Sequence, residues 1–371
     1  MKQFCIKPTI KQFETVSDFC KEYAIGKGDL LFVSGSTYEK FFKGLTDCAH
    51  VVNYRKYGAG EPTDIMVENI YKDIKHVEYN RVIAVGGGTI LDVAKLFALK
   101  HISPVVDLFD RSLEVVRDKK LVLVPTTCGT GSEVTNISIL ELTAKNTKMG
   151  LAVEELYADD AVLIPEFLKD LPFKFFATSS IDALIHAIES YTSPKANSFT
   201  QMFSLKAMEI ILNAYKAIAR DGEEARIPLL GDLLTASTYA GIAFGNAGCA
   251  AVHAMSYPLG AAYHVPHGEA NYAMFTEVYK MYQSINPTGS IAQLNAFLAE
   301  ILGCKPEEVY EEIEVLLNHI IPKKALHEYG VTESDLESFT ETVMTKQGRL
   351  MANNYVELDQ DTVFDIYKTL Y

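Results

Sequence analysis

Residues 81–92 read RVIAVGGGTILD: an apolar run leads into three glycines and then into a helical pattern. A nearly continuous apolar run is typical of a strand buried on both faces of a parallel sheet. Glycines permit a tight turn and let backbone N–H groups approach a phosphate, and the start of a helix adds the positive end of its dipole. The stretch therefore predicts a strand, a phosphate-binding turn and a helix.

This turn also has a purely structural interpretation. Thr89 would be the N-cap of the helix and Asp92 the acidic residue of a capping box. The glycines do not follow the G-x-G-x-x-G fingerprint of dinucleotide-binding turns, so that fingerprint does not decide between the two interpretations. On the residues alone, both remain open.

Strand-like and helical patterns alternate through the first half of the chain. Helices are expected at 63–74 and 89–99, and a hairpin is expected around 134–152. The alternation predicts an α/β domain with a doubly wound, mostly parallel sheet. The expected strands cover residues 30–34, 50–54, 81–87, 121–127 and 161–165.

The pattern changes after Pro172, where long helical patterns follow one another and clear strands disappear. We therefore expect a dinucleotide-binding α/β domain at 1–172 and an all-helical metal-binding and substrate domain at 173–371, with the site between them. The expected helices of the second domain cover 178–192, 198–220, 225–245, 247–257, 288–302, 306–318, 333–352 and 360–370.

A second polar turn follows the strand expected at 121–127. Residues 125–135 read PTTCGTGSEVT, with five hydroxyl side chains and two glycines. Ligands of open α/β sheets bind at the carboxyl ends of the strands, so this turn is a candidate binding surface. A Ser/Thr-rich turn without a ligand is the alternative.

Metal-ligating side chains occur in the second half. Asp182 and His186 are four residues apart in a helical pattern and therefore share a helix face. His253 and His267 bound the segment HAMSYPLGAAYHVPH, whose small and apolar residues do not resemble a solvated charged face. One Asp with three His suits Fe(II), Zn(II), Mn(II) or Co(II). Alternatively, Asp182 is a first-turn acid and His186 a core histidine.

Composition limits the class of protein. The 371 residues are 48% hydrophobic and 22% charged, with a net charge of −14, which argues against a nucleic-acid partner. The longest apolar runs are of strand length and the N-terminus has no signal-peptide pattern, so no membrane segment is expected. The six cysteines are scattered without C-x-x-C, which favours reduced thiols in the cytoplasm. Homo-oligomerisation is left open.

Several of these motifs together resemble the iron-dependent (group III) alcohol dehydrogenases. The D-x-x-x-H segment is followed by A-F-G-N-A-G…H-A-M…P-L-G…P-H-G, and the Gly-rich and Thr-rich turns precede both, so that the resemblance covers nearly the whole chain. It implies one divalent metal, with Fe(II) expected and Zn(II) as the alternative that the same ligands would bind more tightly. The implied metal ligands are Asp182, His186, His253 and His267.

The resemblance also implies a nicotinamide cofactor. NAD is expected, and NADP stays open because Val33-Ser34-Gly35-Ser36 carries neither an acid for the ribose nor an Arg for a 2′-phosphate. For Lys148, an exposed hairpin lysine is the alternative to a cofactor contact. The implied cofactor-binding residues are Gly86, Gly87, Gly88, Thr89, Asp92, Thr126, Thr127, Thr130 and Lys148.

The reaction implied is reversible hydride transfer between a primary alcohol and its aldehyde. The expected pair is 4-hydroxybutyrate and succinate semialdehyde, with butanol, 1,3-propanediol and lactaldehyde as alternatives. Where many members of the family have a further histidine after the third ligand, this chain has Tyr257, so His264 is the candidate proton relay. Lining the pocket is the alternative role of His264.

Two other classes compete with a dehydrogenase. A metal- and NAD-dependent lyase of the dehydroquinate-synthase type would need Lys and Arg around a phosphate, and the segments 178–192 and 241–273 contain neither. A sensor that binds metal and nucleotide without turnover is the second competitor, and the intact ligand set disfavours it.

Overall fold

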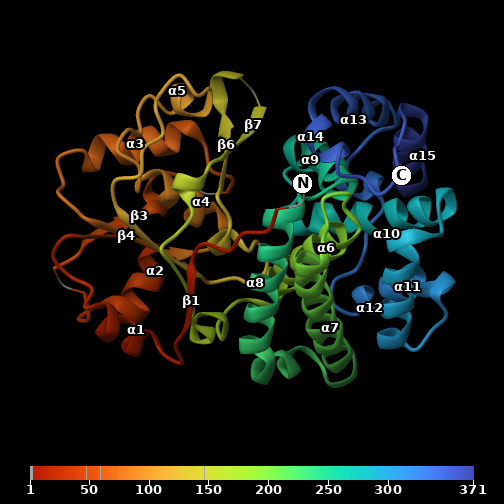
Figure 1. The fold of residues 1–371 in the computed structure, drawn as a ribbon, viewed down its shortest axis with the longest axis horizontal. Helices are drawn as coiled ribbons and strands as arrows, with labels where there is room; N and C mark the ends of the chain where they lie inside the picture. Colours follow the sequence, from red (N-terminus) through yellow and green to blue (C-terminus); the bar gives the residue numbers. More distant parts are fainter. Residues whose placement is uncertain (1–2, 47, 59, 146) are drawn as a thin grey trace. The chain divides into compact units, whose positions relative to one another are not determined.

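The computed structural model describes residues 3–46, 48–58, 60–145 and 147–371, and it divides into two compact units (Figure 1). The α/β unit comprises Ile6–Asp170, and the helical unit comprises Met1–Cys5 with Leu171–Tyr371. The expected boundary lay after residue 172. The N-terminal segment joins the helical unit through Cys5, whose backbone N–H donates to Asn246 Oδ1 (2.7 Å) and whose carbonyl accepts from Asn246 Nδ2 (3.0 Å).

The α/β unit is built on a six-stranded sheet in the order β1-β8-β5-β4-β2-β3, and all neighbouring strands are parallel. This arrangement confirms the predicted fold class. An antiparallel hairpin of β6 (Ile137–Leu142) and β7 (Thr147–Ala152) lies where one was expected. The sheet strands are β1 (Thr9–Gln12), β2 (Asp29–Val33), β3 (His50–Asn53), β4 (Arg81–Gly86), β5 (Lys120–Pro125) and β8 (Asp160–Leu163).

Strand β1 was not expected from the sequence. Its four residues, TIKQ, are polar or exposed, because β1 lies at the edge of the sheet and pairs only with β8. The central strands β2 and β5 are buried along nearly their whole length, as strands covered on both faces should be. The described helices of this unit are α1 (Val16–Tyr23), α2 (Gly35–Thr37), α3 (Asp64–Ile74), α4 (Gly88–Leu96) and α5 (Val105–Phe109).

The strand order reverses between β2 and β4. After β2 the chain continues outward to β3, and it then returns to β4 on the other side of β2 and proceeds to β5. Ligands of open α/β sheets bind outside the carboxyl ends of the strands at such a switch point. The turn that follows β4, with Gly87 and Gly88, lies at this position.

The helical unit is centred on α6 (Phe173–Thr192), which is buried along most of its length and packs against α7, α8 and α10. A helix that is apolar on nearly all sides is a core helix. The other helices are α7 (Ser198–Asp221), α8 (Leu230–Ala247), α9 (Ala251–Tyr263), α10 (His267–Ile285), α11 (Gly289–Leu302), α12 (Val309–Asn318), α13 (Glu333–Lys346), α14 (Gly348–Met351) and α15 (Gln360–Leu370).

Helix α10 was missed in the sequence analysis, and α9 is longer than expected. Pro258 lies inside α9, and the helix ends only where His264 adopts a left-handed conformation (φ 54°). Pro266 is the N-cap of α10 and Gly268 lies in its first turn. These residues usually end helices, and here they separate two helices that follow one another closely.

One segment, Glu223–Ala247, is long and apolar enough to cross a membrane by length and composition, which the sequence analysis did not foresee. Apolar core helices meet the same criteria. More than half of its most apolar window is buried inside the protein, and α8 packs against α6 and α7.

A buried lysine links α4 to the turn after β5 and to the hairpin. Lys95 is fully buried, and its Nζ donates to Ser132 Oγ (2.7 Å), Thr135 Oγ1 (3.2 Å) and the Ile137 carbonyl (2.6 Å). It also forms an ion pair with Asp92 at 3.1 Å. Burial lowers the pKa of Lys95, and the negative charge of Asp92 opposes that shift.

We predict that Lys95→Met lowers the free energy of unfolding of the α/β unit by about 3 kcal/mol or more, because it leaves a partly buried carboxylate and several acceptors without their donor. Lys100→Met, at an exposed position after α4, is the matched control and should change little. Urea denaturation followed by circular dichroism measures both. Equal stability of the two variants would contradict the role assigned to Lys95.

Candidate metal centre

The structure brings the four candidate metal ligands together. Asp182 and His186 lie one turn apart on α6, His253 lies on α9, and His267 is the first residue of α10. Asp182 Oδ1 lies 3.8 Å from Nε2 of His186 and 3.7 Å from Nε2 of both His253 and His267. We call these four residues the Asp–His cluster.

These separations fit a single divalent ion. Two ligand atoms that each bind an ion at about 2.1 Å lie at most about 4.2 Å apart, and all three Oδ1–Nε2 distances are shorter than that limit. The donor set of one carboxylate and three imidazoles suits Fe(II) and Zn(II) alike. The ligand atoms of Asp182, His253 and His267 all lie within 4.8 Å of one another.

The cluster is buried on one side and accessible on the other. The side chains of Asp182, His186 and His253 are almost completely buried, whereas the His267 side chain is 37% exposed. The rings of His186 and Phe244 stack with their centroids 4.1 Å apart, which closes the His186 side. A small molecule can therefore approach the cluster from the side of His267.

The charge of the cluster favours an ionised carboxylate. Burial by itself would raise the pKa of Asp182, but the positive charges available on His186, His267 and His253 outweigh burial and hold this pKa well below its usual range. Asp182 therefore supplies one fixed negative charge among three neutral or cationic rings. Such a site retains net positive charge when it holds a divalent ion.

Glu189, which the sequence analysis missed, orients His253. Its Oε2 lies 2.5 Å from His253 Nδ1, and its Oε1 accepts the Val252 N–H at 2.8 Å, while the Glu189 side chain is fully buried. Because Nδ1 is engaged, Nε2 of His253 is left facing Asp182. Glu189 follows His186 by three residues on α6, so helical spacing could have revealed it.

Asn271, on α10, contacts three of the ligand atoms. Its Nδ2 donates to Asp182 Oδ1 at 2.8 Å and lies 3.2 Å from Nε2 of both His253 and His267. Its Oδ1 is buried without a hydrogen-bond partner among the residues described. The Asn271 amide therefore braces the cluster, and it has unused capacity to accept a hydrogen bond at the same place. No sequence signal pointed to Asn271.

A close approach of two backbones sets the position of His267. A Cβ at Gly268 would lie 1.9 Å from the carbonyl oxygen of Thr178, so only glycine permits α10 to meet α6 at this point. The neighbouring His267 is thereby held beside Asp182. The glycine of the P-H-G motif is thus a packing requirement of the metal centre.

Of Tyr257 and the candidate proton relay His264, only Tyr257 contacts the Asp–His cluster among the described residues. The ring of Tyr257 is 5.9 Å from the ring of His267, so this phenol lies beside the cluster. His264 is exposed at the end of α9, and among the described contacts none joins it to a ligand. The relay role of His264 stays a prediction to which the geometry adds no support.

The candidate cofactor residues of the two turns lie together in the α/β unit. Gly86 and Thr126 end adjacent strands, and the Thr126 N–H donates to the Gly86 carbonyl at 3.0 Å. A Cβ at Gly87 would meet Thr127 at 3.6 Å, and a Cβ at Gly88 would lie 2.7 Å from Thr130 Cγ2. Gly86, Gly87, Gly88, Thr126, Thr127 and Thr130 therefore form one surface at the switch point of the sheet.

Three other predicted cofactor residues have protein partners. Gly87, and not Thr89, is the N-cap of α4, and Thr89 Oγ1 donates to the Gly60 carbonyl at 3.3 Å. Asp92 accepts hydrogen bonds from Ser132 Oγ (2.6 Å) and the Ile139 N–H (3.0 Å). The capping-box interpretation is therefore wrong, and Asp92 holds the hairpin to α4. Lys148 lies 3.4 Å from Glu61 and is partly exposed.

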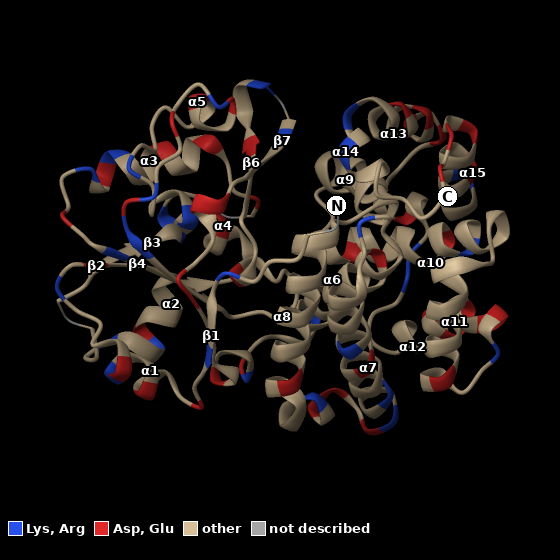
Figure 2. Ribbon diagram, in the orientation of Figure 1, with Lys and Arg blue, Asp and Glu red and all other residues tan. Residues whose placement is uncertain are grey.

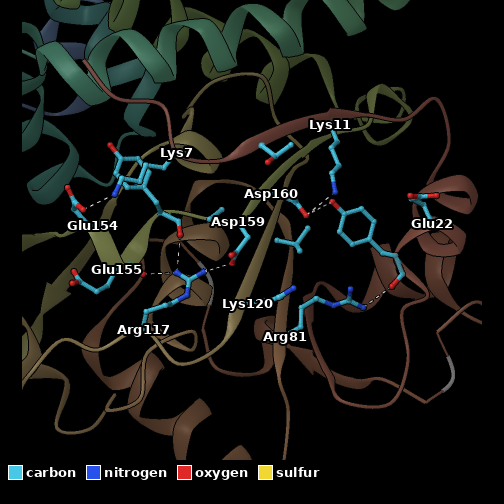
Figure 3. A pocket seen from close by; sticks show the side chains of 15 residues that line it. Lys7, Lys11, Glu22, Arg81, Arg117, Lys120, Glu154, Glu155, Asp159 and Asp160 are labelled. Carbon is cyan, nitrogen blue, oxygen red and sulfur yellow. Dashed lines mark hydrogen bonds and ion pairs between the residues drawn. The ribbon is translucent and has the colours of Figure 1, made fainter. Parts of the chain in front are cut away.

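A cavity of about 830 Å³ opens elsewhere in the α/β unit, at the amino ends of the strands (Figure 3). Lys120 and Asp160, the first residues of β5 and β8, belong to its lining. Charged side chains around it pair with one another, as in Arg117–Asp159 (2.8 Å) and Lys7–Glu154 (2.7 Å). This cavity lies at the end of the sheet opposite the Gly-rich turn, and we assign no catalytic role to it.

Comparisons with known proteins agree with the fold and with the family that the sequence motifs resemble. Residues 10–165 match the family model of iron-containing alcohol dehydrogenases, and residues 176–371 match the C-terminal model of Fe-containing alcohol dehydrogenases. The chain is 49% identical to 4-hydroxybutyrate dehydrogenase of Clostridium kluyveri over 371 residues, which is the whole of both chains. It is 34% identical to long-chain-alcohol dehydrogenase 1 of Geobacillus thermodenitrificans, covering 79% of this chain and 75% of that one.

Solved structures share the fold over the whole chain. Sulfoacetaldehyde reductase from Bifidobacterium kashiwanohense, in complex with NAD⁺, aligns with a TM-score of 0.85 at 21% identity, covering 100% of this chain and 98% of that one. Alcohol dehydrogenase from Oenococcus oeni aligns with a TM-score of 0.87 at 19% identity over the whole of both chains.

Glu189→Gln should weaken metal binding by about ten- to a hundredfold, because a neutral amide holds His253 less firmly than a carboxylate. The measurement is the apparent Kd for Zn(II) or Co(II), by competition with a chelator. Glu300→Gln, at an exposed position on α11, is the control. Unchanged affinity in Glu189→Gln would contradict the orienting role.

Gly268→Ala should destabilise the helical unit by about 3 kcal/mol or more, because the added methyl group overlaps a backbone oxygen that cannot move alone. Gly260→Ala in α9 is the matched control. Its Cβ would meet the Val265 carbonyl at an ordinary 3.6 Å, so its stability should stay equal or rise by up to about 1 kcal/mol. Thermal unfolding compares the two, and similar losses would refute the packing argument.

Proposed function

The chain belongs to the iron-containing alcohol dehydrogenase family, and we propose on this premise that it interconverts a primary alcohol and its aldehyde by NAD-linked hydride transfer at the Asp–His cluster. One observation carries the proposal: three imidazole Nε2 atoms lie within 3.8 Å of a single carboxylate oxygen. That geometry suits a Lewis-acidic divalent ion, which can polarise a carbonyl oxygen for hydride transfer.

The proposed ion is Fe(II), with Zn(II) as the alternative that the same ligands accept. Bound by the cluster, it would stabilise the negative charge that develops on the substrate oxygen. Side chains of the cluster and its neighbours shield, orient and expose the site. His186 and His253 are buried and exclude water, Glu189 holds His253 in one orientation, and the partly exposed His267 leaves one side open to the substrate.

The proposed cofactor is NAD, with NADP as the alternative. The Gly86–Gly88 turn and the threonines after β5 lie at the carboxyl ends of adjacent strands beside the switch point, which suits a dinucleotide. Gly88 must stay a glycine because of Thr130, and its lack of a side chain also leaves the backbone accessible to a phosphate. Thr89, Asp92 and Lys148 have protein partners, so their proposed part in cofactor binding is secondary.

The proposed substrate pair is 4-hydroxybutyrate and succinate semialdehyde. Identity of 49% over the full length to a 4-hydroxybutyrate dehydrogenase supports it. Other short-chain alcohols and diols are the alternative within the family, and a dehydroquinate-synthase-like lyase is the alternative from another class. None of the six cysteines, all of which lie in the described part of the chain, forms a disulfide, and this supports a reducing, cytoplasmic location as part of the same proposal.

We predict that anaerobically prepared enzyme, reloaded with Fe(II) or Zn(II), oxidises NADH with succinate semialdehyde at a kcat/KM at least about tenfold higher than with butyraldehyde or lactaldehyde. Asp182→Ala should lower kcat/KM by on the order of a hundredfold or more, because it removes the only anionic ligand. The assay follows NADH absorbance.

Asp232→Ala, at an exposed position on α8, is the control and should keep full activity. If the enzyme turned over only uncharged aldehydes, the proposed substrate would be wrong, but the proposed reaction, NAD-linked reduction of an aldehyde, would stand. Absence of net NADH oxidation with every aldehyde and either metal would refute the dehydrogenase and favour the lyase.

A further inference from the structure

Cys249 is a third kind of metal-binding side chain beside two of the candidate ligands. It lies in the short link between α8 and α9, two residues before α9 begins. Its Sγ and one ring nitrogen each of His186 and His253 all lie within 4.8 Å of one another, and the three side chains are buried. Asp182, His253 and His267 meet the same distance limit. We call His186, Cys249 and His253 the Cys–His group.

The backbone at Cys249 is held from two sides. Gly248 has a φ of 80°, and a Cβ there would lie 2.6 Å from Asn353 Nδ2, so a larger residue would be strained at this position. The buried Asn353 donates from Nδ2 to the Cys249 carbonyl at 3.0 Å. Ser193 Oγ, just after α6, donates to the Ala247 carbonyl at 2.7 Å. The position of Cys249 relative to α6 and α9 is therefore fixed.

The two histidines of the group are arranged to share one ion. Their rings stack with centroids 4.7 Å apart and an interplanar angle of 18°. An ion binds a thiolate sulfur at about 2.3 Å and an imidazole nitrogen at about 2.1 Å, so the two atoms lie at most about 4.4 Å apart across it. The limit of 4.8 Å in the Cys–His group exceeds this by less than half an ångström, which a small rotation of the Cys249 side chain covers.

The chemistry of the group differs from that of the Asp–His cluster. A thiolate is a softer ligand than a carboxylate, so one thiolate with two imidazoles favours Zn(II) and Cd(II), whereas Mn(II) prefers oxygen ligands. Helix α9 carries no Lys, Arg, Asp or Glu (Figure 2). The thiolate of Cys249 and the carboxylate of Glu189, which engages His253, would together offset the two charges of the ion. Coordination releases the thiol proton to solvent.

We propose that Cys249 is a metal ligand that, with His186 and His253, binds thiophilic divalent ions such as Zn(II) and Cd(II). This inference rests on the metal centre of the proposed function and specifies which ions that centre prefers. Because the Cys–His group shares both histidines with the Asp–His cluster, the two bind one ion between them. Hard ions are held by Asp182 and the histidines alone, so Cys249 raises the affinity for soft ions selectively.

Co(II) absorption tests whether the sulfur binds metal. The full-length protein is cleared of metal with a chelator and titrated with Co(II). A cobalt–thiolate bond gives an intense charge-transfer band in the near ultraviolet, which imidazole and carboxylate ligands do not give. Wild type should show this band, Cys249→Ser should lose it, and Cys304→Ser, just after α11 in the same unit, should keep it. No band in wild type, or an equal band in Cys249→Ser, refutes the proposal.

Affinities for a soft and a hard ion separate ligation from packing. In Cys249→Ser and in Cys249→Ala, the Kd for Cd(II) should rise at least about tenfold, and the Kd for Mn(II) should change less than about threefold. Mn(II) binding also reports that the site of each variant is folded. Equal weakening for both ions would assign Cys249 a packing role and refute ligation, as would an unchanged Kd for Cd(II).

These assays need no turnover, so they are independent of the proposed reaction. If wild type oxidises NADH with an aldehyde but binds Cd(II) equally well without Cys249, the ligand is refuted and the proposed function stands. If no aldehyde is reduced but Cd(II) binding depends on Cys249, the ligand stands and the proposed reaction is refuted.

Discussion

The contact between Gly268 and the Thr178 carbonyl is the constraint on which the Asp–His cluster depends. A side chain at this position would have its first carbon 1.9 Å from a backbone oxygen, so the approach of α10 to α6 is possible only with glycine. Because His267 and Asn271 lie on α10 and Asp182 lies on α6, this approach brings ligands and supporting residues together. In a densely packed interior, even small backbone shifts cost free energy. The close approach of α10 to α6 therefore fixes the position of His267.

Around that contact, each ligand is held by a different neighbour. Glu189 engages His253 through Nδ1, Phe244 stacks on His186, and Asn271 donates to Asp182. A cluster whose rings are fixed in this way is prepared for an ion before the ion binds, which lowers the cost of ordering the side chains. The single carboxylate keeps its charge despite burial, because three imidazoles surround it.

A close contact at a glycine also positions residues in the α/β unit. Gly88 lies against Thr130 as closely as packing allows, and this contact keeps the Gly-rich turn next to the threonines after β5. Asp92, which the motif suggested for the cofactor, is occupied by Ser132 and by the backbone of Ile139. Its role in the structure is to join α4 to the hairpin. A motif residue can thus hold a glycine-rich turn in place through its hydrogen-bonded neighbours.

The sequence by itself determined the strand–helix alternation and the parallel sheet, and it predicted the candidate ligands Asp182, His186, His253 and His267, which the structure brings together. Local periodicity and ligand spacing are properties of short segments. The sequence did not reveal α10, where proline and glycine suggested an interruption, or the polar edge strand β1. Only the tertiary structure decided the position of Asn271, since its contacts come from helices distant in sequence that pack together. The same packing left His264 exposed, which no local pattern could foretell.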